Sequence, residues 1–246
     1  MGNEDQDTFC KEMRKATKGI HTISDHLVNA KLAFGFLDNS VWADGLLVFY
    51  EIFRYLELSA TRLKHTEIGL FPLDELGRTE AFERDIESYL GKEWRKGYSP
   101  RDAVTKYLKH LEEIEKTEPT LLIAYIYHLY MGLLSGGIIL RKKRQFMRKV
   151  WPFRELQGKD NNITSFESSN ISGLKRRMRD TMNEIADTLD EDMKCKLIQE
   201  SKMVFTLNNE IIRSVRGAGS NLLKKMLFFI IPIVLFLFAF VLPFKR

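Results

Sequence analysis

Apolar residues recur every three or four positions along most of the chain, and this spacing predicts helices. The first such stretch begins after Thr8, the expected N-cap, and continues to about Lys31. No stretch shows the alternation of apolar and polar residues that a strand requires, so the predicted fold class is all-α. One face of the first helix should be buried. This face consists of Phe9, Met13, Ala16, Ile20, Ile23, Leu27 and Ala30.

Further helices are predicted in the remainder of the chain by the same spacing. Gly91 should end one of them, and Pro100 should lie in the first turn of the next. Aromatic residues crowd one side of the second helix, which we expect in the core: Trp42, Phe49, Tyr50 and Phe53. The predicted helices cover residues 39–57, 78–90, 99–116, 120–145, 173–188 and 190–215, whereas 58–78 and 158–172 should be irregular.

Three glycines, Gly132, Gly136 and Gly137, interrupt the apolar stretch 120–145. A glycine inside a helix costs about 0.5–1 kcal/mol relative to alanine, so three cost about 2–3 kcal/mol. Gly132 and Gly136 lie four residues apart and therefore on one face, with Ser135 beside them. Two interpretations are open. The face either packs closely against another helix, or it lets a flat ligand lie on bare backbone while the helix bends.

Residues 226–244 form an almost unbroken apolar stretch of 19 residues without a charge. At about 1.5 Å per residue, this length is enough to cross a bilayer. The sequence therefore predicts a C-terminal transmembrane helix that anchors the protein, with Lys224 and Lys225 on the cytosolic side. The predicted organisation is a disordered lead-in over residues 1–7, a helical domain over 8–216, a linker over 217–225 and the anchor over 226–244.

His21 lies beside the apolar stripe of the first helix, and Arg14 and Lys18 share its face. A single histidine in this position is most often structural. Together with two cations, however, the imidazole suits a metal centre that bears acidic groups. The formal net charge of +5 fits an anionic ligand or an acidic partner and gives no argument for nucleic acid. Cys10 and Cys195 lie far apart and predict reduced thiols.

Three segments together resemble the haem oxygenases. Residues 121–137, LLIAYIYHLYMGLLSGG, resemble the family's distal helix, which lies over haem. Residues 15–21, KATKGIH, resemble the proximal segment that ends in the axial histidine, and 203–208, MVFTLN, resemble a segment of the last helix. The resemblance covers about residues 9–215 and implies a haem oxygenase-like helical domain.

The resemblance also implies roles for individual residues. His21 would be the axial ligand of the iron of haem b, which is both cofactor and substrate. Gly132 and Gly136 would contact haem through their backbone, and Phe205 and Asn208 would lie in the distal pocket. Tyr130 would serve in packing. The haem propionates would be faced by Arg14, Lys18, Tyr127, Lys175 and Arg179.

Three positions depart from the family pattern. Leu133 stands where the family has an aspartate that holds water molecules in the distal pocket, and a leucine cannot hold them. Leu129 replaces an arginine, and Tyr125 replaces a histidine. His128 is an additional titratable group. The sequence leaves open whether His128 or Tyr125 takes over the part of the missing aspartate.

The leading hypothesis is a haem oxygenase that uses O2 and electrons from NADPH-cytochrome P450 reductase to form biliverdin, carbon monoxide and ferrous iron. Leu133 predicts slow turnover or loosened regioselectivity. The alternatives are a membrane-tethered protein that sequesters haem without turnover, and a haem-free helical scaffold. Biliverdin reductase is a further implied partner, and residues 141–149 with Arg176 and Arg177 either dock an acidic flavoprotein or are a solvated helix end. The expected location is the cytosolic face of the endoplasmic reticulum membrane, with the outer mitochondrial membrane as the alternative.

Overall fold

A computed structural model describes residues 8–35, 38–150, 162–166, 170–216 and 231. All regular structure in these residues is helical, which confirms the predicted fold class. The predicted lead-in 1–7, linker 217–225 and transmembrane segment 226–244 lie, apart from Ile231, outside the described residues. The α-helices are α1 (Phe9–Gly35), α2 (Asn39–Arg62), α3 (Leu73–Leu76), α4 (Thr79–Leu90), α5 (Asp102–Thr117), α6 (Leu122–Gly132), α7 (Ile138–Val150), α8 (Ile171–Thr188) and α9 (Glu191–Ser214). Short segments are the 3-10 turns η1 (Glu67–Leu70), η2 (Pro119–Leu121) and η5 (Asn162–Thr164), and the π-helical η3 (Leu133–Gly137).

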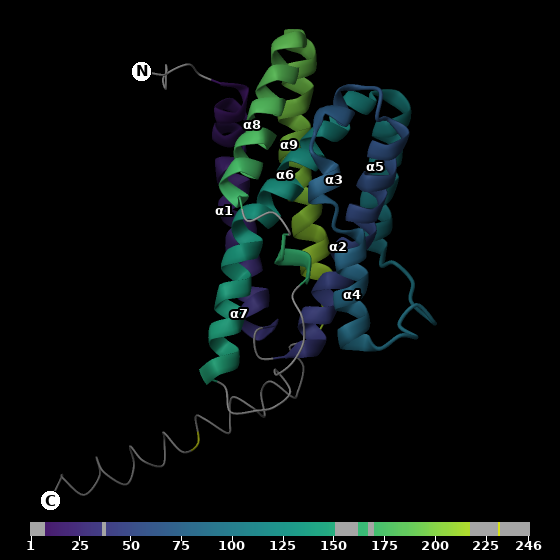
Figure 1. Ribbon diagram of the computed structural model, residues 1–246, viewed down its shortest axis with the longest axis vertical. Helices are drawn as coiled ribbons and strands as arrows, with labels where there is room; N and C mark the ends of the chain where they lie inside the picture. Colours follow the sequence, from purple (N-terminus) through teal and green to yellow (C-terminus); the bar gives the residue numbers. More distant parts are fainter. Residues whose placement is uncertain (1–7, 36–37, 151–161, 167–169, 217–230, 232–246) are drawn as a thin grey trace, which may run out of the picture.

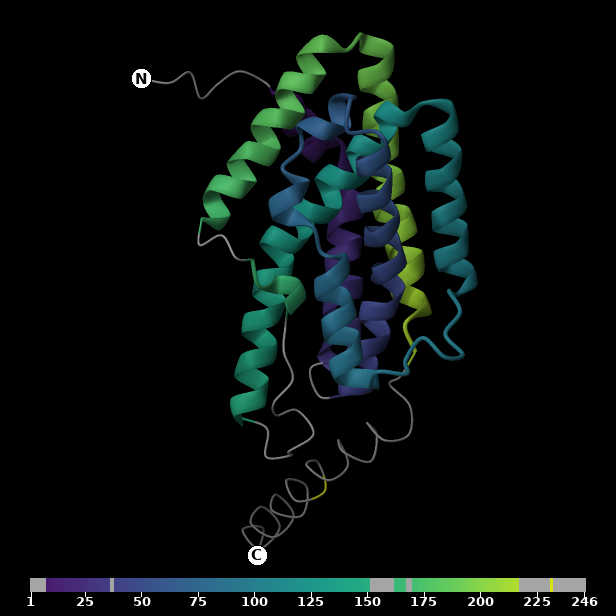
Figure 2. The ribbon, with the colours of Figure 1, turned by 45° about the vertical axis from the view of Figure 1, so that its right-hand side comes forward.

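The long helices lie side by side (Figures 1 and 2). α1 packs along α9, α2 packs against both α4 and α5, and α8 contacts α1 and α6. α6 packs against α9 and is buried on nearly every side, because its residues from Leu122 to Ile126 are all inaccessible to solvent. α6 is therefore the central helix of the fold.

The predicted central helix is present as one uninterrupted helical stretch with a π-helical segment in its middle. η2, α6, η3 and α7 follow each other without a break, and η3 covers Leu133–Gly137, the glycine-rich stretch. π-Helical turns inside α-helices occur frequently at functional sites. Among the described residues, Pro119–Phe146 is also the one helical stretch that is long and apolar enough to cross a membrane. Because more than half of its most apolar part is buried in the protein, this stretch is a core helix.

The buried face of α1 differs from the predicted one. Phe9 and Met13 are buried as expected, but farther along Thr17 and Ser24 are buried in place of Ala16 and Ile23. Ile23 is 53% exposed. Each buried hydroxyl donates a hydrogen bond to a carbonyl of its own helix, Thr17 to Met13 at 2.8 Å and Ser24 to Ile20 at 3.0 Å. Satisfied in this way, small polar side chains can enter the core, and apolarity alone does not predict this.

Several helix boundaries also differ from the prediction. α1 extends to Gly35 rather than about Lys31, and α7 extends to Val150 rather than residue 145. α2 begins at the Asp38 cap, whose side chain accepts a hydrogen bond from the Ser40 amide, and it extends to Arg62 rather than residue 57. α5 starts at Asp102, so Pro100 lies before the helix and not in its first turn. Gly91 ends α4 as predicted, with a φ of 87° that favours glycine.

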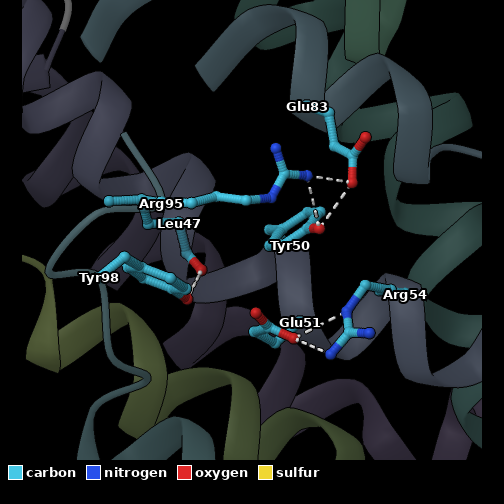
Figure 3. A network of polar contacts seen from close by, with 7 residues as sticks. All are labelled: Leu47, Tyr50, Glu51, Arg54, Glu83, Arg95 and Tyr98. Carbon is cyan, nitrogen blue, oxygen red and sulfur yellow. Dashed lines mark hydrogen bonds and ion pairs between the residues drawn. The ribbon is translucent and has the colours of Figure 1, made fainter. Parts of the chain in front are cut away.

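A polar network fastens the connection between α4 and α5 onto α2 (Figure 3). The Tyr50 hydroxyl donates to Glu83 at 2.7 Å, and Arg95 donates to the same carboxylate at 2.6 Å. The Tyr98 hydroxyl donates to the Leu47 carbonyl at 3.3 Å. These bonds fix the α2–α4 side of the bundle, and the residues of the predicted site lie on α1, α6, η3, α8 and α9 instead.

Candidate functional site

The face of Gly132 and Gly136 is open in the structure. A methyl group built on either glycine would come within 4 Å of no other described segment or side chain, and both residues are exposed. Gly137 differs, because it is buried and a methyl group there would lie 3.3 Å from Thr164 Cγ2. Close packing therefore accounts for Gly137 alone. The other two glycines leave a bare backbone surface at the junction of α6 and η3.

His21 projects from α1 with its imidazole oriented by a carboxylate. Its Nδ1 lies 3.1 Å from Asp25 Oδ2, one helical turn farther along, and the two side chains are 54% and 60% exposed. Nε2 has no hydrogen-bond partner among the residues that the structure describes. Histidines that bind metals commonly donate their other ring N–H to a carboxylate in this way.

Phe205 of α9 connects α1 to α6 through its ring. Its centroid is 5.2 Å from that of His21 and 5.1 Å from that of His128, in edge-to-face contacts. His128 also contacts the ring of Tyr127, at 5.3 Å. Burial, and then the charge of His21, lowers the pKa of His128 to about 3, so this ring is neutral at pH 7.

Four of the predicted residues are cations, two of them on the N-terminal half of α1 and two on α8. Arg14, Lys18 and Arg179 are exposed, and Lys175 is half-buried. No side chain of the four forms an ion pair with a carboxylate in the described ranges, whereas the neighbouring Arg177 pairs with Glu75 at 2.5 Å. Unpaired like charges on two packed helices suit an anionic ligand.

Tyr127 of α6 lies close enough to Arg14 and Arg179 to feel their charges. Its side chain is buried beside Cys10, whose thiol donates a hydrogen bond to the Arg179 carbonyl at 3.6 Å. Burial raises the pKa of this thiol, and Tyr127 and the charge of Arg179 oppose the rise. Burial raises the pKa of Tyr127, and the charges of Arg179 and Arg14 oppose this rise. The structure thus brings the predicted Arg14, Tyr127 and Arg179 together at one end of the site.

The family model described as Heme oxygenase matches residues 7–214. The chain belongs to the haem oxygenase family. It is 29% identical over 214 residues to human heme oxygenase 1, covering 83% of this chain and 70% of the relative. Identity to heme oxygenase 2 of Macaca fascicularis is 34% over 225 residues, covering 87% and 67%. The crystal structure of heme oxygenase-2 from Synechocystis in complex with heme and NO matches with a TM-score of 0.74 at 25% identity and covers 85% of each chain.

The remaining predicted residues of this haem oxygenase family member contact the core of the bundle. Leu133 is half-buried and packs against the core. Asn208 accepts a hydrogen bond from the Tyr107 hydroxyl at 3.2 Å. Tyr130 is fully buried, packs on Phe53 at 5.2 Å and donates to Glu57, which agrees with the expected packing role.

The Tyr125 side chain makes its hydrogen bond and ring contacts inside the core. Its hydroxyl donates to Glu200 at 2.5 Å, and His110 Nε2 lies 3.0 Å from the same carboxylate. Burial alone would raise the pKa of Glu200, but the hydrogen bonds from His110 and Tyr125 lower it. The Tyr125 ring packs on Tyr107 at 5.8 Å, so this residue supports the α5–α6–α9 core.

The basic segment 141–149 is only in part a surface feature. Arg144 is fully buried, stacks over Trp42 at 4.3 Å and donates to Asn39 at 2.7 Å, because the planar guanidinium suits both contacts. Arg141 donates to the Thr164 carbonyl at 2.9 Å. Lys142, Lys143 and Lys149 remain exposed.

Sequence reasoning missed two residues of the site. Asp25 follows His21 by four residues, so helical spacing alone could have indicated this carboxylate. Cys10 lies far from Tyr127 in the sequence, and only the packing of α1 and α6 against α8 brings the two side chains together.

Proposed function

We propose that this protein is a haem oxygenase that cleaves haem b to biliverdin, carbon monoxide and ferrous iron with O2 and reductase-supplied electrons. One observation carries the proposal: Phe205 contacts both the exposed, carboxylate-oriented imidazole of His21 on α1 and the ring of His128, which lies one turn before the open glycine face of α6–η3. Membership of the haem oxygenase family supports haem degradation as the function.

The described side chains fit haem in three respects. An imidazole with an unpaired Nε2 suits the iron, and a helix surface without side chains suits a flat ring. Unpaired cations suit two propionates. His21 would hold the iron, and Gly132 and Gly136 would lie against the ring. Arg14, Lys18, Lys175, Arg179 and Tyr127 would hold the propionates.

When bound, haem supplies both the iron that reacts with O2 and the ring that is cleaved. The protein's part is to orient the ring, which we assign to the cations at one end and to His21 on α1. Bare backbone at Gly132 and Gly136 allows the ring to approach closely, which also excludes water from that face. Leu133 offers no donor or acceptor to hold a water molecule. We therefore expect slow turnover or more than one meso-cleavage isomer.

The test is a turnover assay with the full chain in detergent, haemin, NADPH-cytochrome P450 reductase and NADPH. We expect biliverdin and carbon monoxide to form, and His21→Ala to weaken the Soret band of the haemin complex. Isomer analysis of the biliverdin reports the regioselectivity. A complex that binds haemin but yields neither product under O2 would overturn the proposal.

That outcome is the prediction of a second candidate, a membrane-tethered protein that sequesters haem. Leu133 is the observation that favours it, because a leucine in the place of an aspartate removes a polar group from the distal side. The two candidates share haem binding and differ only in turnover. The third candidate, a haem-free helical scaffold, predicts that haemin titration produces no Soret change.

We further propose that the exposed cations Lys142, Lys143 and Lys149 of α7, together with Arg176 of α8, dock the acidic face of the reductase. Arg144 is not part of this surface because it is buried. Residues 226–244 would anchor the protein in the endoplasmic reticulum membrane, or in the outer mitochondrial membrane, with the domain in the cytosol. Charge reversal at Lys142 and Lys143 should raise the reductase concentration needed for half-maximal turnover. Biliverdin reductase would then take up the product.

A further inference from the structure

His128 carries a polar atom for which the described structure gives no partner. Its side chain is half-buried, but Nε2 is fully buried and makes no hydrogen bond with any described residue. Buried polar atoms in native proteins are almost always paired, so an orphan of this kind points to a missing ligand or water. Burial of Nε2 without a partner is unfavourable, and a bound group that pairs with it would recover that loss.

The position of His128 places this nitrogen next to the proposed haem site. His128 precedes Gly132 by one helical turn, so both residues lie on the same face of α6. The ring contacts Phe205, which itself contacts the ring of His21. Three rings from α6, α9 and α1 therefore meet beside the open backbone surface.

Tyr125, the other polar residue that departs from the family pattern, is not available for such a role. Its hydroxyl already donates to Glu200 at 2.5 Å, and the whole side chain is buried in the α5–α6–α9 core. Leu133 has no polar atom to offer. Of Leu133, Tyr125 and His128, only His128 combines a polar atom, a place on the glycine face and the lack of a partner among the described residues.

We propose that His128 is the polar residue of the distal side, and that it hydrogen-bonds through Nε2 to small ligands on the iron of bound haem. The inference rests on the proposed function, because it requires haem in the site. The imidazole of His128, one turn before Gly132, would make the polar contact that Leu133 cannot make. A neutral imidazole can provide it, since one ring nitrogen donates and the other accepts.

The test measures azide binding to the ferric haemin complex of the full chain in detergent by absorbance titration. Azide is a small anion whose affinity responds to a hydrogen-bond donor, and the measurement does not depend on turnover. We expect His128→Leu to lower azide affinity about 3- to 10-fold, the loss of one hydrogen bond. His128→Gln, which retains an N–H donor, should remain within about twofold of the parent. The infrared stretching frequency of bound carbon monoxide should shift in His128→Leu and return toward the parent value in His128→Gln.

Two control variants separate this role from a general effect on the fold. Tyr125→Phe removes the alternative polar group, and His65→Ala removes an exposed histidine near the end of α2; neither should change azide affinity. Equal azide affinity in His128→Leu and the parent would overturn the inference and leave the proposed function intact. So would loss of haemin binding in both His128 variants, because His128 would then be a packing residue. A chain that binds no haemin at all overturns the proposed function, and the inference with it.

Discussion

His21 Nδ1 and Asp25 Oδ2 lie 3.1 Å apart on consecutive turns of α1, and both side chains are more than half exposed. The carboxylate accepts a hydrogen bond from Nδ1, which leaves Nε2 as the nitrogen that would hold the iron of haem. Removal of the carboxylate should loosen the ring and weaken the bond to iron. Asp25→Ala is therefore expected to lower haemin affinity about 10-fold in a Soret titration. Glu12→Ala, which removes an exposed acid of the same helix, is the control. An Asp25→Ala variant with unchanged haemin affinity would argue against an axial role for His21.

Replacement of the exposed glycines should change stability and haem binding in opposite directions. Gly132→Ala meets no described neighbour, so the free energy of unfolding without haem should rise by about 0.5–1 kcal/mol. The added methyl group should at the same time obstruct a ring on this face and lower haemin affinity at least about tenfold. Urea denaturation and haemin titration measure the two effects. Gly45→Ala, also unobstructed but on α2, should raise stability and leave haemin affinity unchanged. A gain in stability without a loss of affinity would show that haem does not lie on this face.

The unpaired cations should act on the ligand and not on the fold. Arg179→Ala is expected to lower haemin affinity about 3- to 10-fold, as for loss of one charge-assisted hydrogen bond, with little change in stability. The effect should disappear with the dimethyl ester of haemin, which has no propionate charge. Arg176→Ala, an exposed arginine on the same helix, is the matched variant and should bind both ligands like the parent.

An acid at position 133 should restore part of the missing polar function. Leu133→Asp is expected to raise the rate of biliverdin formation and to narrow the isomer distribution, because a carboxylate can hold distal water. The same change should destabilise the haem-free protein by about 1–2 kcal/mol, since Leu133 packs half-buried against the core. Leu133→Ala separates loss of bulk from gain of a polar group. If Leu133→Ala raises the rate of biliverdin formation as much as Leu133→Asp, then water held by a carboxylate is not the cause of the gain.

Glu115 should make stability fall in acid. Hydrogen bonds from Arg62, Ser59 and Tyr55 outweigh burial and lower the pKa of Glu115 to about 2. The folded state therefore favours the carboxylate, and this contribution is complete above the unfolded pKa of about 4.5 and lost as pH falls toward 2. Because Arg62 is half exposed, we expect the contribution at pH 7 to be about 2 kcal/mol.

Denaturation of Glu115→Gln between pH 7 and pH 2 tests this account. The variant should be less stable at pH 7, and its stability should change less than that of the parent between about pH 4.5 and 2. Glu112→Gln, an exposed acid on the same helix, should keep the parent's pH dependence. Parallel curves for Glu115→Gln and the parent would contradict the pKa assignment.

The sequence by itself determined the helices and the positions of the unusual residues. Periodic apolar positions located each long helix to within a few residues, since one buried face imposes that period. It also located the three glycines and the departure at Leu133. It could not decide between close packing and an open ligand surface, because both require the same small residues at the same spacing.

Only the tertiary structure made that decision. Packing placed Gly137 against Thr164 and left Gly132 and Gly136 bare. In α1, Thr17 and Ser24 are buried where Ala16 and Ile23 were predicted to be buried. Arg144 of the basic segment is also buried. Likewise, packing paired Tyr125 with Glu200 and left His128 Nε2 without a described partner. Each outcome depends on which residues distant in sequence supply a hydrogen bond or a surface, and helical periodicity carries no information about those partners.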